Sequence, residues 1–238
     1  MKFLLIGLLS VTSAFAVSIK DHDHYNYDVF FTNPNCPAYE YDETVYSFDG
    51  DVLNSKPENV YCKYNDARSN EKRKSSPHYN LVKLMSDKDV SELRMAYLSF
   101  SSSGIIKTLC EKTIGENNTK ITLVVDKGNK SDERKMEKLN ALAACKPAEK
   151  YYDAGVANEP VIEFRGQNGG LGYAHNKIIM ANYKSEADKI TIVYSSANMS
   201  SGTVLHHENW HFLTTSTESY FAQAHTCIID GMIDHSNS

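Results

Sequence analysis

Four side chains in the second half of the chain could act together on a phosphodiester. His175 and Lys177 precede one strand-like run, and Ser196 and Asn198 follow the next. Side chains two positions apart on an extended chain share a face, and a hairpin returns the second strand to the same edge of the sheet. An imidazole can attack phosphorus, an ammonium can neutralise the non-bridging oxygens, and a hydroxyl and an amide can donate hydrogen bonds. This chemistry requires neither a metal ion nor another cofactor.

A second pattern overlaps the first and suggests different chemistry. His207, Glu208 and His211 form the sequence H-E-x-x-H, which on a helix places two imidazoles on one face for zinc and leaves the glutamate as general base. The residues that follow, 212–217, are β-branched and polar, which favours a strand. On a strand, Glu208 points away from both histidines. We therefore prefer an interpretation without zinc, and we interpret His22 and His24 as part of a flexible mature N-terminus rather than a metal site.

The elements that would position these groups alternate along the chain after Pro77. Strands bounded by helices predict an α/β fold built in layers. The predicted helices are 79–86, 104–113, 131–145 with Ser131 as N-cap, and 216–235. The predicted strands are 92–100, 120–126, 161–164, 177–183, 189–195 and 210–215.

The first group of residues resembles a known signature. His175-Asn-Lys177, four residues and Asn182, then Ser195-Ser196-Ala197-Asn198, is similar to the HKD motif of the phospholipase D superfamily. Segments 94–109 and 120–126 resemble the opening strand, helix and second strand of that family. Glu208-Asn209 resembles the acidic residue and asparagine that follow the motif in small, single-motif, secreted bacterial nucleases. The resemblance extends over about residues 77–235.

The resemblance implies a phospholipase D-like α-β-α sandwich with a mixed central sheet. It also implies a metal-independent phosphodiesterase, a secreted non-specific endonuclease for DNA or RNA that forms a phosphohistidine. His175 would be the nucleophile in one subunit and the acid/base in the other, and Glu208 would orient an imidazole. Lys177 and Asn198 would hold phosphoryl oxygens, with Ser196 assisting. Because the chain carries one motif, the resemblance implies a homodimer with its active site at the two-fold interface.

Two positions depart from the family pattern. Asn182 replaces the family aspartate and Ser195 replaces its glycine; with Asn209, they are expected to support the site. Two alternatives stay open: a phospholipase D acting on phospholipid headgroups, and a catalytically weakened relative that binds nucleic acid or lipid. The glycine-rich loop 166–172 offers one large apolar residue, Leu171, whereas a phospholipase needs an apolar rim for acyl chains.

Composition and the N-terminus limit these alternatives. The chain has 238 residues with 25 Lys and Arg and 30 Asp and Glu, a formal charge of −5. This mild acidity argues against a general nucleic-acid coat protein, although a local basic cleft remains compatible with it. Residues 1–16 are typical of a cleavable signal peptide, which predicts a secreted or periplasmic protein without a stable membrane anchor. Residues 17–76 are predicted to be an irregular, Tyr-rich extension, and 77–238 the catalytic domain.

The cysteine content fits an exported protein with one thiol left over. There are five cysteines, so at most two internal disulfides form. We predict a Cys36–Cys62 disulfide that closes the N-terminal segment. For Cys110 and Cys145, which fall on predicted helices, a disulfide and a pair of reduced core cysteines remain equally open.

Overall fold

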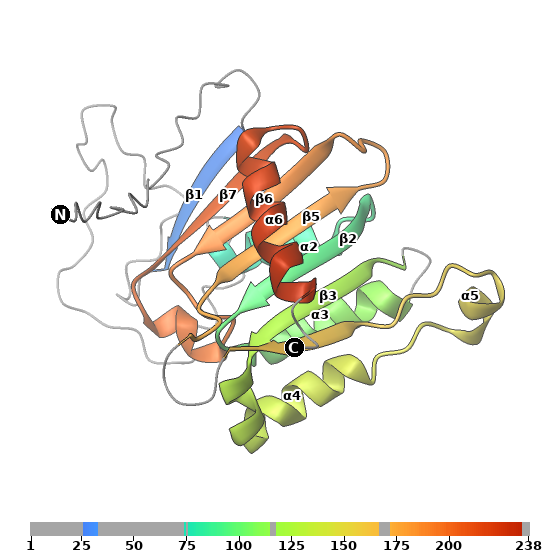
Figure 1. Cartoon of the computed structure of the whole chain (residues 1–238), viewed down its shortest axis with the longest axis horizontal. Helices are drawn as coiled ribbons and strands as arrows, with labels where there is room; N and C mark the ends of the chain where they lie inside the picture. The colour runs from blue at the N-terminus through green and yellow to red at the C-terminus, as the bar shows by residue number, and fades with distance from the viewer. Residues whose placement is uncertain (1–25, 33–73, 75, 115–117, 167–171, 235–238) are drawn as a thin grey trace, which may run out of the picture.

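The computed structural model describes residues 26–32, 74, 76–114, 118–166 and 172–234. Seven strands form one sheet in the order β1-β7-β6-β5-β2-β3-β4 (Figure 1). Strands β2, β3 and β4 run parallel, whereas β5, β6, β7 and β1 form antiparallel pairs and β5 joins β2 antiparallel. The strands are β1 (Asn26–Thr32), β2 (Val90–Tyr97), β3 (Lys120–Asp126), β4 (Val161–Arg165), β5 (Lys177–Tyr183), β6 (Lys189–Ser195) and β7 (Glu208–Ser216).

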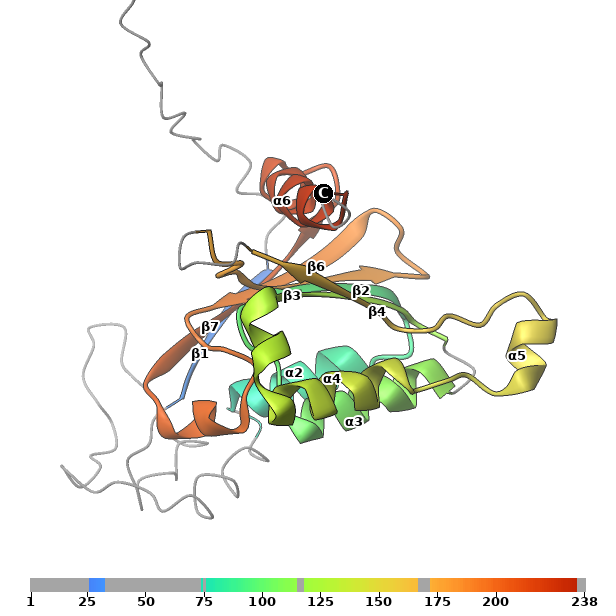
Figure 2. The ribbon, with the colours of Figure 1, turned by 60° about the horizontal axis from the view of Figure 1, so that its bottom comes forward.

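Helices cover both faces of this mixed sheet, so the predicted α-β-α sandwich is confirmed. Figure 2 shows three helices on one face, α2 (Pro77–Ser86), α3 (Ser103–Ile114) and α4 (Glu133–Ala143). Helix α6 (Tyr220–Asp234) lies on the other face, and the short α5 (Glu149–Asp153) projects from the side of the molecule.

Alternation along the central strands divides the core between the two faces. In β5, Ile179 and Ala181 join the larger apolar cluster beneath α2, α3 and α4. Ile178 and Met180 join the smaller cluster beneath α6. Central strands are therefore buried on both sides, which explains the nearly continuous apolar runs that predict them.

The helix ends are set by side-chain caps. Helix α2 begins after Ser76, whose hydroxyl accepts the Tyr79 N–H, and Pro77 occupies its first turn. Helix α4 is capped by Asp132 instead of the predicted Ser131. The reason is that Asp126 starts a 3-10 turn over Lys127–Ser131, which uses Ser131 before the α-helix begins.

Most predicted elements are present, and the main difference lies near the N-terminus. Residues 26–32, expected within an irregular extension, pair with β7 as an edge strand. Their side chains are mostly exposed, so no alternating apolar pattern marks them as a strand. Helix α6 also begins at Tyr220, later than the predicted residue 216.

The disulfide expectations have different outcomes. Cys110 and Cys145 form a disulfide that joins α3 to the chain just after α4, with their Cα atoms 5.4 Å apart. The predicted Cys36–Cys62 disulfide and the signal peptide lie outside the described residues. Cys227 is an exposed free thiol. Within the described ranges, no helix is both long and apolar enough to cross a membrane.

Candidate active site

The predicted site residues gather where three antiparallel strands begin or end. Strand β5 begins at Lys177, β6 ends at Ser195 and β7 begins at Glu208. The loop after β2 fixes both halves of the site. The Leu98 N–H donates to the Asn176 carbonyl at 3.2 Å, and the Ser101 N–H donates to the Met199 carbonyl at 2.7 Å. The segments that carry His175 and Asn198 are thus held by one loop.

His175 and Lys177 lie side by side in different environments. His175 is exposed, whereas Lys177 is 8% exposed. The Lys177 Nζ lies 3.3 Å from the Nδ1 of His175 and donates to the carbonyl oxygen of the same histidine at 3.2 Å. Burial lowers the pKa of Lys177, and the nearby charge of Glu208 opposes that shift. A cation is therefore held beside an accessible imidazole.

Ser196 links the end of β6 to the start of β7. Its hydroxyl donates to Glu208 Oε2 at 2.5 Å and accepts the Asn209 N–H at 3.1 Å. The Ser196 N–H in turn donates to the Asn209 carbonyl at 3.2 Å, and it lies 3.3 Å from Asn209 Oδ1. These contacts fix the exposed serine beside the carboxylate and hold Asn209 against Ser196.

Asn198 is held by its backbone and leaves its amide oxygen unpaired. The Thr203 hydroxyl donates to the Asn198 carbonyl at 2.7 Å. The buried Oδ1 of Asn198 has no hydrogen-bond partner among the described residues. This oxygen is a buried acceptor, so a phosphate oxygen would have to bind at the Nδ2 amide nitrogen. Ser195, expected to support the site, folds its hydroxyl onto the N–H and carbonyl of Ala197 at 3.1 Å each.

Two residues that the sequence analysis missed contact Glu208. The Thr32 hydroxyl accepts the Glu208 N–H at 2.9 Å and donates to the His206 carbonyl at 2.6 Å, so β1 helps to position the carboxylate. His206 Nδ1 lies 3.6 Å from Glu208 Oε1. Among the described residues, the imidazole paired with Glu208 is therefore that of His206. No sequence motif includes Thr32, which is 176 positions away from Glu208.

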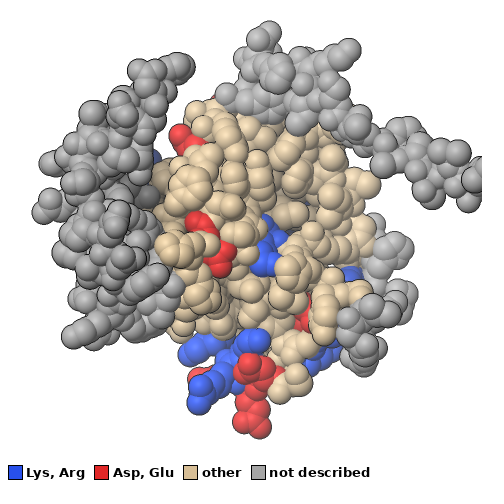
Figure 3. Space-filling view, turned by 90° about the vertical axis from the view of Figure 1, so that its left-hand side faces the viewer, with Lys and Arg blue, Asp and Glu red and all other residues tan. Residues whose placement is uncertain are grey.

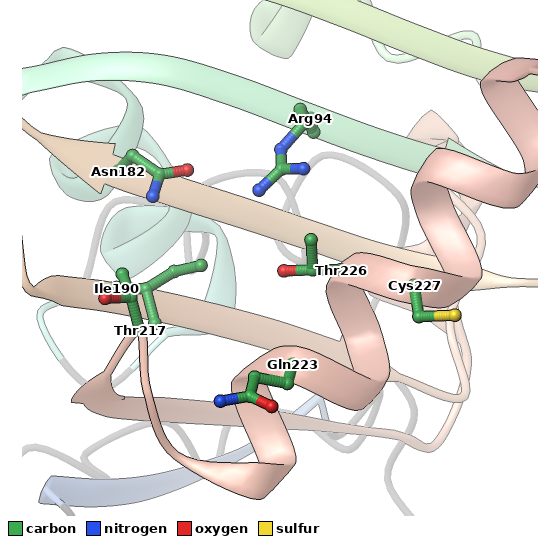
Figure 4. A pocket seen from close by; sticks show the side chains of 7 residues that line it. All are labelled: Arg94, Asn182, Ile190, Thr217, Gln223, Thr226 and Cys227. Atoms are coloured by element: carbon green, nitrogen blue, oxygen red, sulfur yellow. The ribbon is translucent and has the colours of Figure 1, made fainter.

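Asn182 does not join this group. It lies near the other end of β5, about 16 Å from Lys177 at the usual rise of a strand. There it lines a cavity of about 380 Å³ beneath α6, together with Arg94 and residues of the helix (Figure 4). Asn182 therefore does not contact the other predicted site residues, and any support that it gives them would act over that distance.

The H-E-x-x-H segment adopts the strand that its sequence favours. Glu208 and His211 both lie in β7, and His211 stacks between Tyr194 and Tyr27 with ring centroids 4.7 and 5.8 Å away. The Tyr27 hydroxyl also lies 2.5 Å from His211 Nδ1. The helical face that would bring two histidines to one zinc ion is therefore not formed. The described residues contain no cluster of three or more metal-ligating side chains.

The surface around these strand ends carries few charges. In Figure 1 the arrowheads of β2, β3 and β6 point to the left, and Figure 3 views the molecule from that side. Lys and Arg atoms gather near the centre of this face with Asp and Glu atoms beside them, and a mixed charged group lies at the lower edge. The described surface around the central group is largely uncharged. An anion bound there would meet a local cation and not a broad basic surface.

Solved structures share this architecture over nearly the whole chain. A phospholipase D family member, Nuc from Salmonella typhimurium, aligns with a TM-score of 0.51 and 13% identity, covering 90% of this chain and 95% of Nuc. NucT from Helicobacter pylori aligns with a TM-score of 0.52 and 11% identity, covering 89% of this chain and 97% of NucT. The chain has the phospholipase D fold. No family model matches the sequence, and neither does any curated protein.

This fold agrees with the resemblance that the motif implies. The strands next to His175, Lys177, Ser196 and Asn198 belong to the central sheet of this fold. At identities of 11–13%, the two alignments establish the architecture alone. The chemistry of the site has to be argued from this chain's own residues.

Proposed function

We propose that this protein is a metal-independent phosphodiesterase that cleaves nucleic acid through a phosphohistidine at His175. The observation that carries the proposal is the placement of an exposed His175 against the buried cation of Lys177, at the sheet edge that also holds Ser196, Asn198 and Glu208. Nuc, a phospholipase D family member, has the same fold. The predicted signal peptide supports action outside the cytoplasm.

The reaction follows from the groups at this edge. An imidazole nitrogen of His175 attacks phosphorus, and the bond from phosphorus to the leaving ester oxygen breaks. Lys177 neutralises the non-bridging oxygens, and the amide of Asn198 donates to one of them. Water then attacks phosphorus, the nitrogen–phosphorus bond breaks, and a phosphate monoester is released with the imidazole restored.

A second acid/base is needed to complete this sequence. The leaving oxygen requires a proton, and the attacking water must lose one. The sequence carries a single HKD-like motif, so we assign both transfers to His175 of the partner subunit in a two-fold symmetric dimer. Glu208 then sits at the same edge to orient an imidazole that approaches from the partner.

A metal-free cleavage assay tests the reaction. The protein spanning 17–238 is incubated with single- and double-stranded DNA and with RNA in excess EDTA, beside a His175→Ala variant. We expect cleavage that persists in EDTA and falls by at least about 10³-fold in the variant. Cleavage that requires added zinc would contradict the mechanism. Cleavage of phosphatidylcholine vesicles but of no nucleic acid would assign the site to phospholipid headgroups instead.

Subunit mixing tests the dimer. Wild-type protein is mixed with increasing fractions of His175→Ala protein and incubated until subunits exchange. If each reaction uses both histidines, activity falls as the square of the wild-type fraction, because mixed dimers are inactive. A linear fall, or full activity in a protein that sediments as a monomer, would overturn the two-subunit mechanism.

A further inference from the structure

The segment that carries His175 is tied to the end of β3 by a buried carboxylate. Asp126 is the last residue of β3 and is 4% exposed. Its Oδ2 accepts the N–H of Ala174, the residue directly before His175, at 2.8 Å. Its Oδ1 accepts the N–H of Gly128 at 2.7 Å. One side chain therefore joins the turn after β3 to the histidine segment, across 48 positions of sequence.

The opposite side of His175 is fixed by the chain that follows β2. The Leu98 N–H donates to the Asn176 carbonyl at 3.2 Å. Asn129 strengthens this frame, because its Nδ2 donates to the Leu98 carbonyl at 2.8 Å and to the Asp126 carbonyl at 2.7 Å. His175 thus lies between two anchored neighbours, Ala174 and Asn176, and both anchors belong to one connected set of hydrogen bonds.

The packing around Asp126 leaves its carboxylate little freedom to move. Gly166, just after β4, has φ +93°, and a Cβ at this position would lie 2.5 Å from Asp126 Oδ2. The same Cβ would lie 3.2 Å from the Gly172 carbonyl. The backbone at Gly166 therefore closes directly over the carboxylate oxygen that holds Ala174, and only glycine fits there.

From these contacts we infer that Asp126 is a positioning residue that fixes the His175 backbone for attack on phosphorus. Among the described residues, its carboxylate hydrogen-bonds to the backbone of Ala174 and Gly128 and to none of the side chains assigned to the phosphate. It acts by restricting where the histidine segment can lie, and displacement of a reacting group by about 1 Å can cost on the order of 100-fold in rate. This inference rests on the proposed function for its effect on catalysis, but not for the anchor itself.

The main test compares Asp126→Asn with Asp132→Asn. Each change removes one negative charge from a carboxylate that accepts a backbone N–H, and Asp132 caps α4 and pairs with Lys135 of the same helix. Asparagine has one acceptor oxygen, so at position 126 it leaves Ala174 or Gly128 facing an NH2 group. We expect kcat on a fluorescent oligonucleotide to fall at least tenfold for Asp126→Asn with KM within twofold, and no change for Asp132→Asn. Equal kcat values for the two variants would overturn the inference.

The hydrogen bond from Ala174 to Asp126 can also be tested by a measurement that does not depend on catalytic activity. The amide exchange rate of Ala174, followed by NMR, should rise at least tenfold in Asp126→Asn and stay unchanged in Asp132→Asn. An unchanged rate would overturn the inference whether or not the protein cleaves nucleic acid. An inactive wild-type protein with faster exchange in Asp126→Asn would instead refute the proposed function and retain the anchor.

A pair of glycine variants tests the same Asp126 contact by changing the backbone that packs against the carboxylate. Gly166→Ala introduces a methyl group against Asp126 Oδ2, whereas a methyl group at Gly155, where φ is +67°, would have nothing within 4 Å. Gly155→Ala therefore carries the backbone strain without the contact. We expect kcat to fall at least tenfold only in Gly166→Ala. Similar kcat values for the two variants would mean that the carboxylate does not control the histidine.

Discussion

The two ends of strand β5 carry different residues of one motif, Lys177 and Asn182, and have different surroundings. At the first end, Lys177 is buried beside the exposed His175, and the exposed Ser196 donates to Glu208. At the other end, Asn182 lines a cavity with Arg94, and Arg94 Nη1 donates to Asp230 of α6 at 2.7 Å. One end carries exposed polar side chains, and the other pairs the sheet with a helix.

The residues proposed to react with phosphorus and the residue expected to support them therefore lie at opposite ends of β5. The replacement of the family aspartate by Asn182 falls at the end of β5 that faces α6 (Figure 4). The groups that would bind and attack phosphorus lie at the first end, where His175, Lys177, Ser196 and Asn198 match the family pattern and Ser195 alone departs from it. The substitution at 182 is therefore a weak argument for a catalytically weakened protein.

Among the variants that test this comparison, the largest effect is expected from loss of the Lys177 cation at the first end. Lys177→Met keeps the unbranched apolar stem, one atom shorter, but removes the charge, so kcat/KM should fall by about 10²–10³-fold. Lys112→Met is the matched control. Lys112 is also buried, its pKa is lowered to about 8 chiefly by burial, and its Nζ donates to the Asp87 carbonyl far from His175. Steady-state cleavage assays should show a large loss for Lys177→Met alone; equal losses would remove the distinction between the two regions.

The second prediction concerns a contact that supports the helical layer. The Cys110–Cys145 disulfide closes a separation of 35 residues, so replacing both cysteines by serine should lower the free energy of unfolding by roughly 2–4 kcal/mol. Urea unfolding measures this loss, with Cys227→Ser as the control for an exposed thiol. Activity at 25 °C should remain within twofold. A large loss of activity without loss of stability would connect this layer to the chemistry.

The sequence predicts the central strands of the sheet better than its edge strand β1. Strands β3, β5 and β6 begin and end at the predicted residues, because each is a short apolar run between polar turns. Strand β1 could not be predicted from pattern, since an edge strand with exposed side chains has no apolar alternation. Its stability comes from pairing with β7, a partner 176 or more positions away.

Some features of the candidate site could likewise be predicted from the sequence, and others could not. His175, Lys177, Ser196 and Asn198 could be predicted because hairpin geometry brings strand ends together. The distance of Asn182 from them also follows from the rise of a strand, once β5 is assigned. The contacts of Thr32 and Asp126 could not be predicted, because each links segments whose proximity depends on the complete sheet order.

A smaller loss of activity is expected when Glu208 no longer stabilises the charge of Lys177. Burial lowers the pKa of Lys177 and the charge of Glu208 raises it, so Glu208→Gln should lower that pKa further. The ammonium then loses its proton at lower pH, and the alkaline limb of the kcat/KM profile should move to lower pH. At neutral pH we expect about a tenfold loss. Glu186→Gln, which removes an exposed partner of Lys189, should leave the profile unchanged. A shift of the alkaline limb to higher pH would contradict this assignment.

The smallest expected effect lies at the other end of β5. Asn182→Asp restores the family carboxylate beside Arg94, but Arg94 already pairs with Asp230. The new charge would also stand directly opposite Glu92 in the β2–β5 register, where like charges repel. The attraction to Arg94 and the repulsion from Glu92 nearly cancel. The free energy of unfolding should therefore change by less than about 1 kcal/mol and kcat by less than twofold. Thermal unfolding and cleavage assays measure both. A gain of tenfold or more in kcat would show that residue 182 influences the histidine along the whole strand, and the two ends of β5 would then have to be treated as one site.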